Sequence, residues 1–320
     1  MSFQFKPAIR EQVGLLIGLA GGTGSGKTFS AMRMASGISA DKPFAVIDTE
    51  AGRAKHYADQ FKFDHGDLKA PFSPEAYAEA ILAADAAKYP VIVVDSMTHE
   101  WAGEGGVLEM QEAELDRMAG DDFKKREACK MAAWIRPKMD HKKMVQRLLQ
   151  VRAHLILCFR AEEKIEMVRE DGKMKIVPKV SLTGINGWIP VCEKNLPFEL
   201  TASFLLTADA PGMPKPIKLQ EQHKIMFPLG HPIDEESGKK VAAWASGGKA
   251  DNYVSLAITE FSVLNSLDSL KTSFARAYTR AKKSGDVSDM TCLQNAYDAA
   301  KLKLTPRQEA AIDEEEEPTI

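Results

Sequence analysis

One eight-residue stretch of this 320-residue chain constrains its fold more than any other feature. Residues 21–28 read GGTGSGKT and fit the pattern G-x-x-x-x-G-K-[ST] at every fixed position. An apolar run at 13–20 precedes the loop, and Ala, Met and Arg recur at helical spacing over 27–37. Strand, glycine loop and helix in this order predict a phosphate-binding loop, in which backbone N–H groups and the positive helix end surround phosphate oxygens.

Each residue of this loop has an expected role in nucleotide binding. Backbone amides that cradle the phosphates are expected from Gly21, Gly22, Thr23, Gly24, Ser25 and Gly26. The Lys27 ammonium should reach the β- and γ-phosphates, and the Thr28 hydroxyl should bind Mg²⁺. The sequence therefore predicts ATP and Mg²⁺ as cofactors.

A second metal ligand and a catalytic base are expected at strand ends. The apolar run 91–94 leads into Asp95, a Walker B pattern in which the carboxylate holds Mg²⁺. The residue after Asp95 is Ser96, which has no carboxylate, so the catalytic base must come from another position. Glu50, at the carboxyl end of the second predicted strand, is the favoured residue to orient or deprotonate the attacking water, and Glu100 is the alternative.

Four further basic residues are candidates for contact with the γ-phosphate. Arg160 ends a predicted strand, where it either senses the γ-phosphate or forms a structural salt bridge. Lys215, Lys218 and Lys224 lie on a late predicted hairpin. Either one of these lysines reaches a neighbouring subunit's nucleotide, as arginine fingers do, or all three are simply solvated.

Strand and helix patterns alternate along the first half of the chain. Strands are predicted at 13–20, 44–47, 91–94 and 154–159, and helices at 27–37, 75–88 and over much of 100–153. This alternation predicts an α/β fold with a parallel sheet and helices on both faces. Two later hairpins, at 164–177 and 204–227, are expected to extend the sheet with antiparallel strands.

The chain divides into four predicted segments. A P-loop core at 1–245 is followed by a linker at 246–258, a helical hairpin at 259–306 and an acidic, disordered tail at 307–320. The sequence SGGK marks the linker, and apolar residues recur every three or four positions on either side of a Ser-Gly-Asp break in the hairpin. Five consecutive acidic residues near the end predict the disorder of the tail.

Composition excludes several classes of protein. No apolar run reaches the roughly 18 residues of a membrane span, and the N-terminal residues show no secretion signal. We therefore expect a cytoplasmic protein with no membrane partner. Four widely spaced cysteines favour reduced thiols over a zinc site or a disulfide framework.

Charge is unevenly distributed along the chain. The net charge is −3, yet residues 121–160 hold eleven Lys and Arg against four Asp and Glu. Such a stretch indicates either a polyanion-binding face or a solvated helix surface. If the polyanion is DNA, the expected phosphate contacts in the Lys124–Arg152 region come from Lys124, Lys125, Arg126, Lys130, Lys138, Lys142, Lys143 and Arg147. Trp134 is then either a base-stacking residue or part of the core.

Three of these motifs together resemble the RecA/RadA/KaiC branch of P-loop ATPases. They are GGTGSGKT at 21–28, IDTE at 47–50 and VDS at 94–96. The resemblance implies a RecA-like P-loop core over about residues 1–245, with Glu50 as the catalytic glutamate. The chain departs from RecA itself in having a charged hairpin at 161–179 where RecA has a glycine-rich DNA-binding loop.

The wider pattern looks like the compact RecA-like ATPases of bacteriophages. It consists of FKPA at 5–8, DSMTHEW at 95–101 and the strand 154–160 with its charged hairpin. Phe5 and Ala8 also match the Phe-x-x-Ala docking element of RadA-like filaments, although packing against the chain's own core is an alternative. The C-terminal helical hairpin is similar in style to small modules of phage annealing proteins.

Three functions are compatible with these features. The favoured one is an ATPase of phage-type DNA recombination, a homo-oligomer that binds single-stranded DNA and acts with a single-strand-binding or annealing protein. An ATP-dependent switch or loader that acts on a protein partner without DNA is the second. A small-molecule kinase is third, because the sequence shows no clear arginine-bearing lid.

Overall fold

The computed structural model describes residues 14–40, 42–170, 173–179, 187–228, 230–247, 253–284 and 287–304. The chain separates into two units after Ser246. The FKPA segment, Gly184, the centre of the 164–177 hairpin turn and the acidic tail lie outside the described residues. No helix in the described part of the chain is long and apolar enough to cross a membrane.

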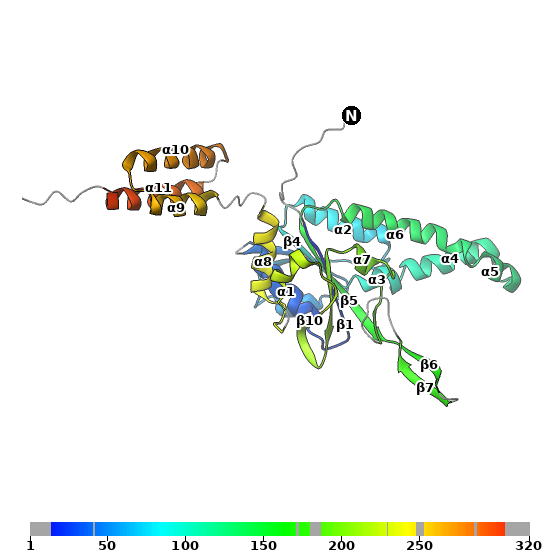
Figure 1. Ribbon diagram of the computed structural model, residues 1–320. Helices are drawn as coiled ribbons and strands as arrows, with labels where there is room; N and C mark the ends of the chain where they lie inside the picture. The colour runs from blue at the N-terminus through cyan, green and yellow to red at the C-terminus, as the bar shows by residue number, and fades with distance from the viewer. Residues whose placement is uncertain are drawn as a thin grey trace, which may run out of the picture. The chain divides into compact units, whose positions relative to one another are not determined.

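A mainly parallel sheet forms the centre of the first unit (Figure 1). Its strands are β1 (Leu16–Gly21), β2 (Phe44–Asp48), β3 (Phe63–Asp67), β4 (Val91–Asp95), β5 (His154–Glu163), β8 (Trp188–Pro190), β9 (Ala202–Thr207) and β10 (Ala210–Lys218). They are ordered β10-β9-β1-β5-β4-β2-β3, and β8 pairs with the end of β5. Only the β9–β10 and β5–β8 pairs are antiparallel.

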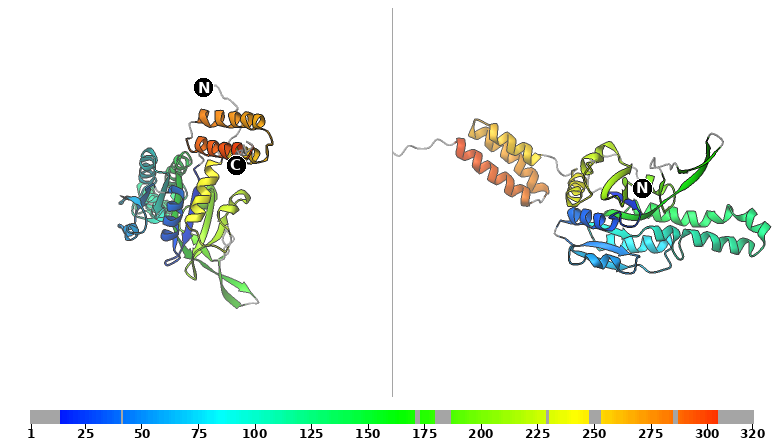
Figure 2. Two further views of the ribbon diagram at one scale, coloured as in Figure 1. Left: turned by 90° about the vertical axis from the view of Figure 1, so that its left-hand side faces the viewer. Right: turned by 90° about the horizontal axis from the view of Figure 1, so that it is seen from below.

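Helices cover both faces of this sheet, which confirms the predicted fold class (Figure 2). Because side chains alternate along a strand, each strand contributes to two cores. Val91 and Val93 belong to a core with α1 (Lys27–Ser39) and α8 (Glu235–Ser246). Ile92 and Val94 belong to the opposite core with α2 (Pro74–Ala86) and α6 (Ile135–Leu148). The predicted strands at 44–47, 91–94 and 154–159 and the predicted helices at 27–37 and 75–88 are confirmed.

The helix that follows the P-loop is held in place by close packing against α8. A Cβ on Gly37 of α1 would lie only 2.0 Å from the Glu235 carbonyl oxygen, so a side chain there would separate the two helices. The Arg33 guanidinium also forms a salt bridge with the Glu235 carboxylate at 2.6 Å. These contacts fix the start of α1, and with it the phosphate-binding loop.

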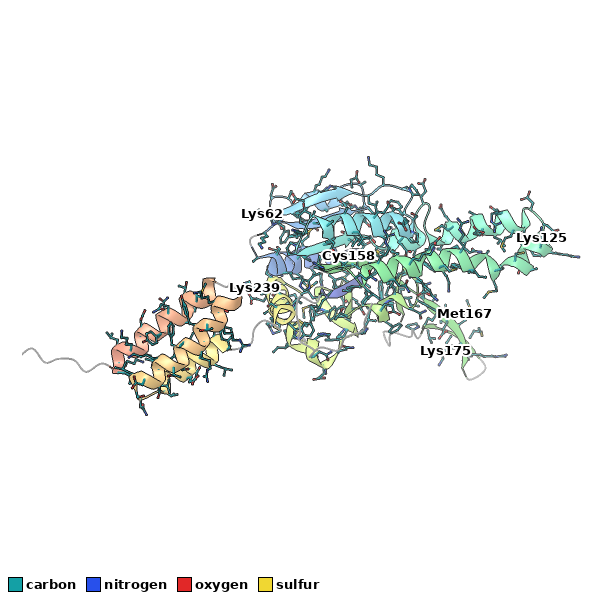
Figure 3. The ribbon with its side chains drawn as sticks, turned by 90° about the horizontal axis from the view of Figure 1, so that it is seen from above. Lys62, Lys125, Cys158, Met167, Lys175 and Lys239 are labelled. Atoms are coloured by element: carbon teal, nitrogen blue, oxygen red, sulfur yellow. The ribbon has the colours of Figure 1, made fainter. Side chains whose placement is uncertain are left out.

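Two insertions project from the core beyond the sheet. One is a helical arm made of α4 (Val107–Ala119), α5 (Phe123–Cys129) and α6, which follows the short helix α3 (Thr98–Ala102). The other is the hairpin of β6 (Ile165–Glu170) and β7 (Lys173–Pro178). Figure 3 labels Lys125 near the far end of the arm, Met167 and Lys175 on the hairpin, and Cys158 inside the core. Helix α7 (Leu196–Glu199) and 3₁₀ turns at Arg53–Tyr57, Ala132–Trp134 and Glu221–Met226 complete the unit.

The second unit is a three-helix bundle, where a two-helix hairpin was predicted. It consists of α9 (Tyr253–Val263), α10 (Leu267–Ser284) and α11 (Val287–Leu304). Phe261, Leu270 and Leu293 are buried in its centre. Helix α9 starts inside the predicted linker, 246–258. Its sequence YVSLAITEFSV is apolar at most positions, so it lacks the one-sided spacing that revealed the other two helices.

Several predicted strands differ from the structure. The β6–β7 hairpin forms a sheet of its own and does not extend the main sheet. Strand β9 pairs parallel with β1, and β10 includes the Pro-rich stretch that was predicted as a turn, because an edge strand tolerates proline. Much of the predicted strand 217–227 is a 3₁₀ turn. Strand β3 was not predicted, because FDHGD has a single large apolar residue.

Candidate nucleotide site

A cavity of about 870 Å³ lies at the carboxyl ends of the central strands. All eight residues of the loop 21–28 line it, together with Glu50, Asp95 and Arg160. The chain therefore brings every predicted nucleotide, metal and catalytic residue of this subunit to one cavity. This position agrees with the general rule that ligands of open α/β sheets bind outside the carboxyl ends of the strands.

The P-loop has the backbone that its glycines predict. Gly26 has φ of +81°, a left-handed conformation that side chains rarely adopt, and a Cβ there would lie 3.0 Å from the Gly212 nitrogen. Helix α1 begins at the next residue, so its N-terminal amides face the cavity. The Lys27 ammonium donates to the Gly22 carbonyl oxygen at 2.8 Å, and burial lowers the pKa of Lys27.

Thr28 and Asp95 meet in the way a metal site requires. The Thr28 hydroxyl donates to the Asp95 carboxylate at 2.6 Å. Burial raises the pKa of Asp95 to about 6, because a desolvated carboxylate has little compensating charge beside it. A divalent cation supplies that charge, and hydroxyl and carboxylate oxygens are the ligands that Mg²⁺ prefers. These residues fit the predicted ion.

Glu50 and Arg160 form a direct ion pair. Arg160 contacts one carboxylate oxygen of Glu50 at 2.6 Å, and Arg53 contacts the other at 3.0 Å. Burial of Glu50 opposes its ionisation, but the hydrogen bonds from Arg160 and Arg53 outweigh burial and lower its pKa. The structure thus shows the salt bridge that was one of the two interpretations of Arg160.

Buried polar residues, none of them predicted to act here, hold Glu50 in position. The Asp48 carboxylate is 1% exposed and accepts hydrogen bonds from the backbone nitrogens of Glu50 at 2.6 Å and Ala54 at 2.9 Å. The next residue, Thr49, shares a 2.8 Å hydrogen bond with His99 and accepts one from the Ser96 nitrogen at 2.9 Å. The loops after β2 and β4 are therefore joined beside the cavity.

Sequence reasoning missed several further residues that line the cavity, four of them aromatic, basic or histidine side chains. These four are Phe29, Arg53, Tyr57 and His99. Phe29 and Tyr57 have ring centroids 5.9 Å apart, so one wall of the cavity is aromatic. One sequence feature could have predicted two of them: Arg53 and Tyr57 lie one helical turn apart in a short polar stretch just after Glu50.

The remaining predicted candidates lie outside this cavity. Glu100 is 1% exposed and pairs with His141 at 2.9 Å, so it serves the packing of α3 against α6. The Lys218 ammonium donates to two backbone carbonyls, at 2.5 and 2.6 Å, and Lys224 pairs with Glu221 at 2.6 Å. Lys215 is exposed on β10 and makes no ion pair within the described part of the chain.

Acidic residues neutralise more of the positive charge of residues 121–160 than the sequence of that stretch indicates. Five of its eight named basic residues have acidic partners, and several of those partners lie in distant parts of the chain. Arg126, for example, pairs with Glu112 and Asp116 of α4. A count of charges along 121–160 cannot include these acids. Lys124, Lys125 and Lys142 make no ion pair within the described residues.

One comparison with known proteins gives the family of this chain. A family model described as AAA domain matches residues 14–187, more than half of the chain, and the chain belongs to this family of P-loop proteins. Its motifs at 21–28, 47–50 and 94–96 resemble those of RecA/KaiC-like P-loop proteins. Among solved structures, a KaiC-like protein from the hyperthermophilic archaeon Pyrococcus horikoshii matches 61% of this chain and 71% of its own, at 15% identity and a TM-score of 0.31. No curated protein matches the sequence.

Proposed function

We propose that this chain binds ATP with Mg²⁺, hydrolyses the ATP, and acts in single-strand DNA metabolism of the phage recombination type. The convergence of Lys27, Thr28, Asp95 and Glu50 on one cavity carries the proposal. A P-loop that served only to bind an anion would not need a buried carboxylate beside its Thr hydroxyl.

Each residue of the cavity has a defined task in this proposal. The loop amides and Lys27 bind the phosphates, and Thr28 and Asp95 hold Mg²⁺. When bound, Mg²⁺ would neutralise the negative charge that develops on the phosphates during phosphoryl transfer. Tyr57 and Phe29 provide an aromatic wall that suits the adenine base.

Glu50 then orients the attacking water. The lowered pKa of Glu50 keeps its carboxylate ionised at neutral pH and makes it a weak base. We therefore expect Glu50 to accept a hydrogen bond from the water and not to act as a strong proton acceptor. Arg160 lies beside the same cavity, within reach of Glu50. We expect Arg160 to leave this carboxylate and contact the γ-phosphate when ATP binds. Arg160 would then form the salt bridge in the free protein and sense the γ-phosphate in the ATP-bound protein.

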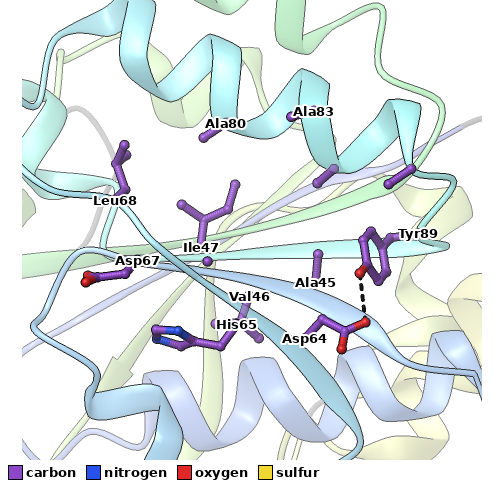
Figure 4. Close-up of a pocket in the computed structure, with 13 residues that line it drawn as sticks. Ala45, Val46, Ile47, Asp64, His65, Asp67, Leu68, Ala80, Ala83 and Tyr89 are labelled. Carbon is purple, nitrogen blue, oxygen red and sulfur yellow. Dashed lines mark hydrogen bonds between the residues drawn. The ribbon is translucent and has the colours of Figure 1, made fainter.

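Self-association is part of the proposal. The edge strand β3 and helix α2 enclose a groove of about 360 Å³, with alanines 80, 83, 84 and 87 along the helix side (Figure 4). Small residues leave room for an apolar side chain, and an edge strand offers unpaired backbone groups to another chain. We infer that Phe5 and Ala8 of a neighbouring copy occupy this groove, as the Phe-x-x-Ala resemblance implies. Phe5→Ala should then convert an oligomer to monomer in light scattering, whereas a protein that remains oligomeric contradicts this contact.

One experiment tests the main proposal. Purified protein is assayed for ATP hydrolysis with and without single-stranded DNA at low and moderate salt, beside Lys27→Ala. Hydrolysis that DNA stimulates in a salt-sensitive way, and that the variant lacks, is the expected result, because phosphate contacts release counterions. The absence of hydrolysis under every condition contradicts the enzymatic proposal.

A second candidate function is an ATP-dependent switch that acts on a protein partner. The β6–β7 hairpin favours it, because one face of this isolated ribbon carries four exposed apolar side chains. Ile165, Met167, Met174 and Ile176 lie on that face by strand register, and each is at least 60% exposed. Robust hydrolysis that is indifferent to DNA would support this function over the first.

A further inference from the structure

A second cavity, of about 780 Å³, lies between the base of the helical arm and the end of β5. Its walls come from four separate parts of the chain: α3, residues 131–142, residues 162–164 and residues 189–194. The predicted nucleotide site does not use it. It combines two features that the rest of the described surface does not bring together, a pair of indoles and a group of lysines.

The indoles of Trp101 and Trp134 stack against each other and together form an aromatic surface of this cavity. Their centroids are 5.9 Å apart and their planes differ by 17°, so the rings lie nearly parallel. Both side chains are only partly buried and both line the cavity. The exposed side chains of Met131 and Met139 continue this surface. Such a surface suits the face of a planar base.

Four lysines surround the aromatic surface. Lys138, Lys142, Lys164 and Lys194 line the cavity, against the acidic residues Glu162 and Glu193. Lys138 lies 5.7 Å from the centroid of the Trp134 ring and 3.9 Å from Glu193. The other three lysines form no ion pair within the described ranges. The surplus of positive charge is therefore available to an anionic ligand. Nucleic acid is an anionic ligand that combines phosphates with planar bases.

We propose that this cavity binds single-stranded nucleic acid, with a base against the Trp101–Trp134 pair and flanking phosphates on Lys142, Lys164 and Lys194. The inference rests on the proposed function and names the site where DNA is bound. An apolar peptide would use the indoles and methionines, but it would leave the lysines without a partner.

The second cavity shares walls with the nucleotide cavity. Glu162 and Val191 line both. The five-residue helix α3 carries His99 to the nucleotide cavity and Trp101 to the second one. Thr98 of the same helix accepts a hydrogen bond from the Arg160 nitrogen at 2.8 Å. Nucleic acid that shifts Trp101 therefore acts on the elements that hold Arg160 and Glu50, which provides a route for DNA to stimulate hydrolysis.

Binding of a fluorescein-labelled oligo(dT) by the full chain, measured by anisotropy, tests this site. Trp134→Ala should weaken binding about tenfold or more, because stacking on one aromatic residue contributes strongly to single-strand affinity. Trp134→Phe should retain most of the affinity. Lys142→Ala should reduce the slope of log affinity against log salt by about 0.7, the value for one phosphate contact on a single strand.

Two variants at the far end of the arm are matched controls. Phe123 is 74% exposed and Lys125 is exposed, and neither lines the second cavity. Phe123→Ala and Lys125→Ala should bind oligo(dT) like the wild type. Unchanged ATP affinity in Trp134→Ala shows that this variant is folded. If Trp134 is only a packing residue, Trp134→Ala instead loses stability and ATP binding together, and Trp101→Ala then serves as the second stacking variant.

The outcomes separate this inference from the proposed function. A wild type that binds oligo(dT), with Trp134→Ala, Trp101→Ala and Lys142→Ala all binding equally well, overturns the site but leaves the function in place. DNA affinity that falls instead in Lys125→Ala places the site at the far end of the arm and also overturns the inference. A wild type that binds no oligo(dT) even at low salt overturns both, and the cavity is then assigned to a protein partner.

Discussion

The two cavities of the first unit are built in different ways. The nucleotide cavity is formed at the ends of the central strands by backbone groups and by side chains that include the buried Asp95, and its defining loop is one contiguous stretch, 21–28. The second cavity is formed by partly exposed side chains from four segments, two of which border the arm and the hairpin. Rigid strands fix the first, whereas insertions into the same sheet create the second. We therefore expect the chemistry at the first cavity and the recognition of a further ligand at the second.

This difference gives each cavity its own expected response to mutation. Changes in the nucleotide cavity should abolish turnover, because phosphoryl transfer depends on positioned charge. Changes in the second cavity should alter the response to DNA and leave basal hydrolysis intact. The predictions below test that separation.

Lys27→Ala should have the largest effect. Removal of the ammonium that reaches the β- and γ-phosphates should lower ATP hydrolysis by about 1,000-fold, by analogy with the loss of other charged groups in phosphoryl transfer. A steady-state phosphate-release assay measures this loss, and Lys125→Ala is the matched lysine control. Nucleotide-free DNA affinity of Lys27→Ala should stay within about threefold of the wild type. If hydrolysis persists in this variant, the P-loop is not the catalytic site; if DNA binding is lost with it, the two cavities are not separable.

Glu50→Gln should have the next largest effect. The amide keeps the shape of the carboxylate but loses its charge and basicity, so turnover should fall about 100-fold or more while ATP still binds. Single-turnover hydrolysis and equilibrium binding of a fluorescent ATP analogue measure the two quantities. Turnover near the wild-type rate would show that another group orients the water. Glu100 is a poor substitute, since it is buried against His141 outside the cavity.

The sequence predicted the nucleotide cavity far better than the second one. Residues 21–28, Asp95 and Glu50 are readable because each motif is short in sequence and each strand that carries it is strongly apolar. The neighbour of Glu50 was not readable, because Arg160 is 110 positions away and only the pairing of β4 with β5 and of β2 with β4 brings them together. Trp101 and Trp134 are 33 positions apart on separate elements, so no local pattern relates them.

Arg160→Ala should have an intermediate effect. Loss of its hydrogen bonds to Glu50 should raise the pKa of that carboxyl, because burial then opposes ionisation with only Arg53 to counter it. The acidic limb of the kcat/KM profile, which reports the free enzyme, should move to higher pH, and kcat should fall about tenfold from loss of a γ-phosphate contact. An unchanged kcat/KM profile would mean that the Arg160–Glu50 pair does not control the ionisation of Glu50 before ATP binds.

The last prediction concerns the free energy of unfolding and its dependence on the buried Asp95 carboxylate of the nucleotide cavity. Asp95 is desolvated in the free protein, and its folded-state pKa of about 6 lies above the value of 3.8 for an exposed carboxyl. The folded chain therefore holds this proton more tightly than the unfolded chain does. Stabilisation from that proton is complete below about pH 4 and is lost as the pH rises through about 6. At pH 7.5 the ionised carboxylate destabilises the protein without Mg²⁺ and ATP by an amount on the order of 3 kcal/mol.

Asp95→Asn should remove this term while keeping the hydrogen bond from Thr28. The variant should then exceed the wild type in free energy of unfolding by about 3 kcal/mol at pH 7.5 and by less at pH 5, measured by urea denaturation. Burial lowers the pKa of His154 to about 4, so that residue destabilises both proteins equally as the pH falls, and the difference between them isolates Asp95. A carboxylate placed in the second cavity by Trp134→Asp should not add a comparable pH dependence to the free energy of unfolding, because that cavity is open to solvent. Equal stability of the wild type and Asp95→Asn at pH 7.5 would show that solvent or a neighbouring cation already compensates the Asp95 charge, and that the nucleotide cavity is no more desolvated than the second one.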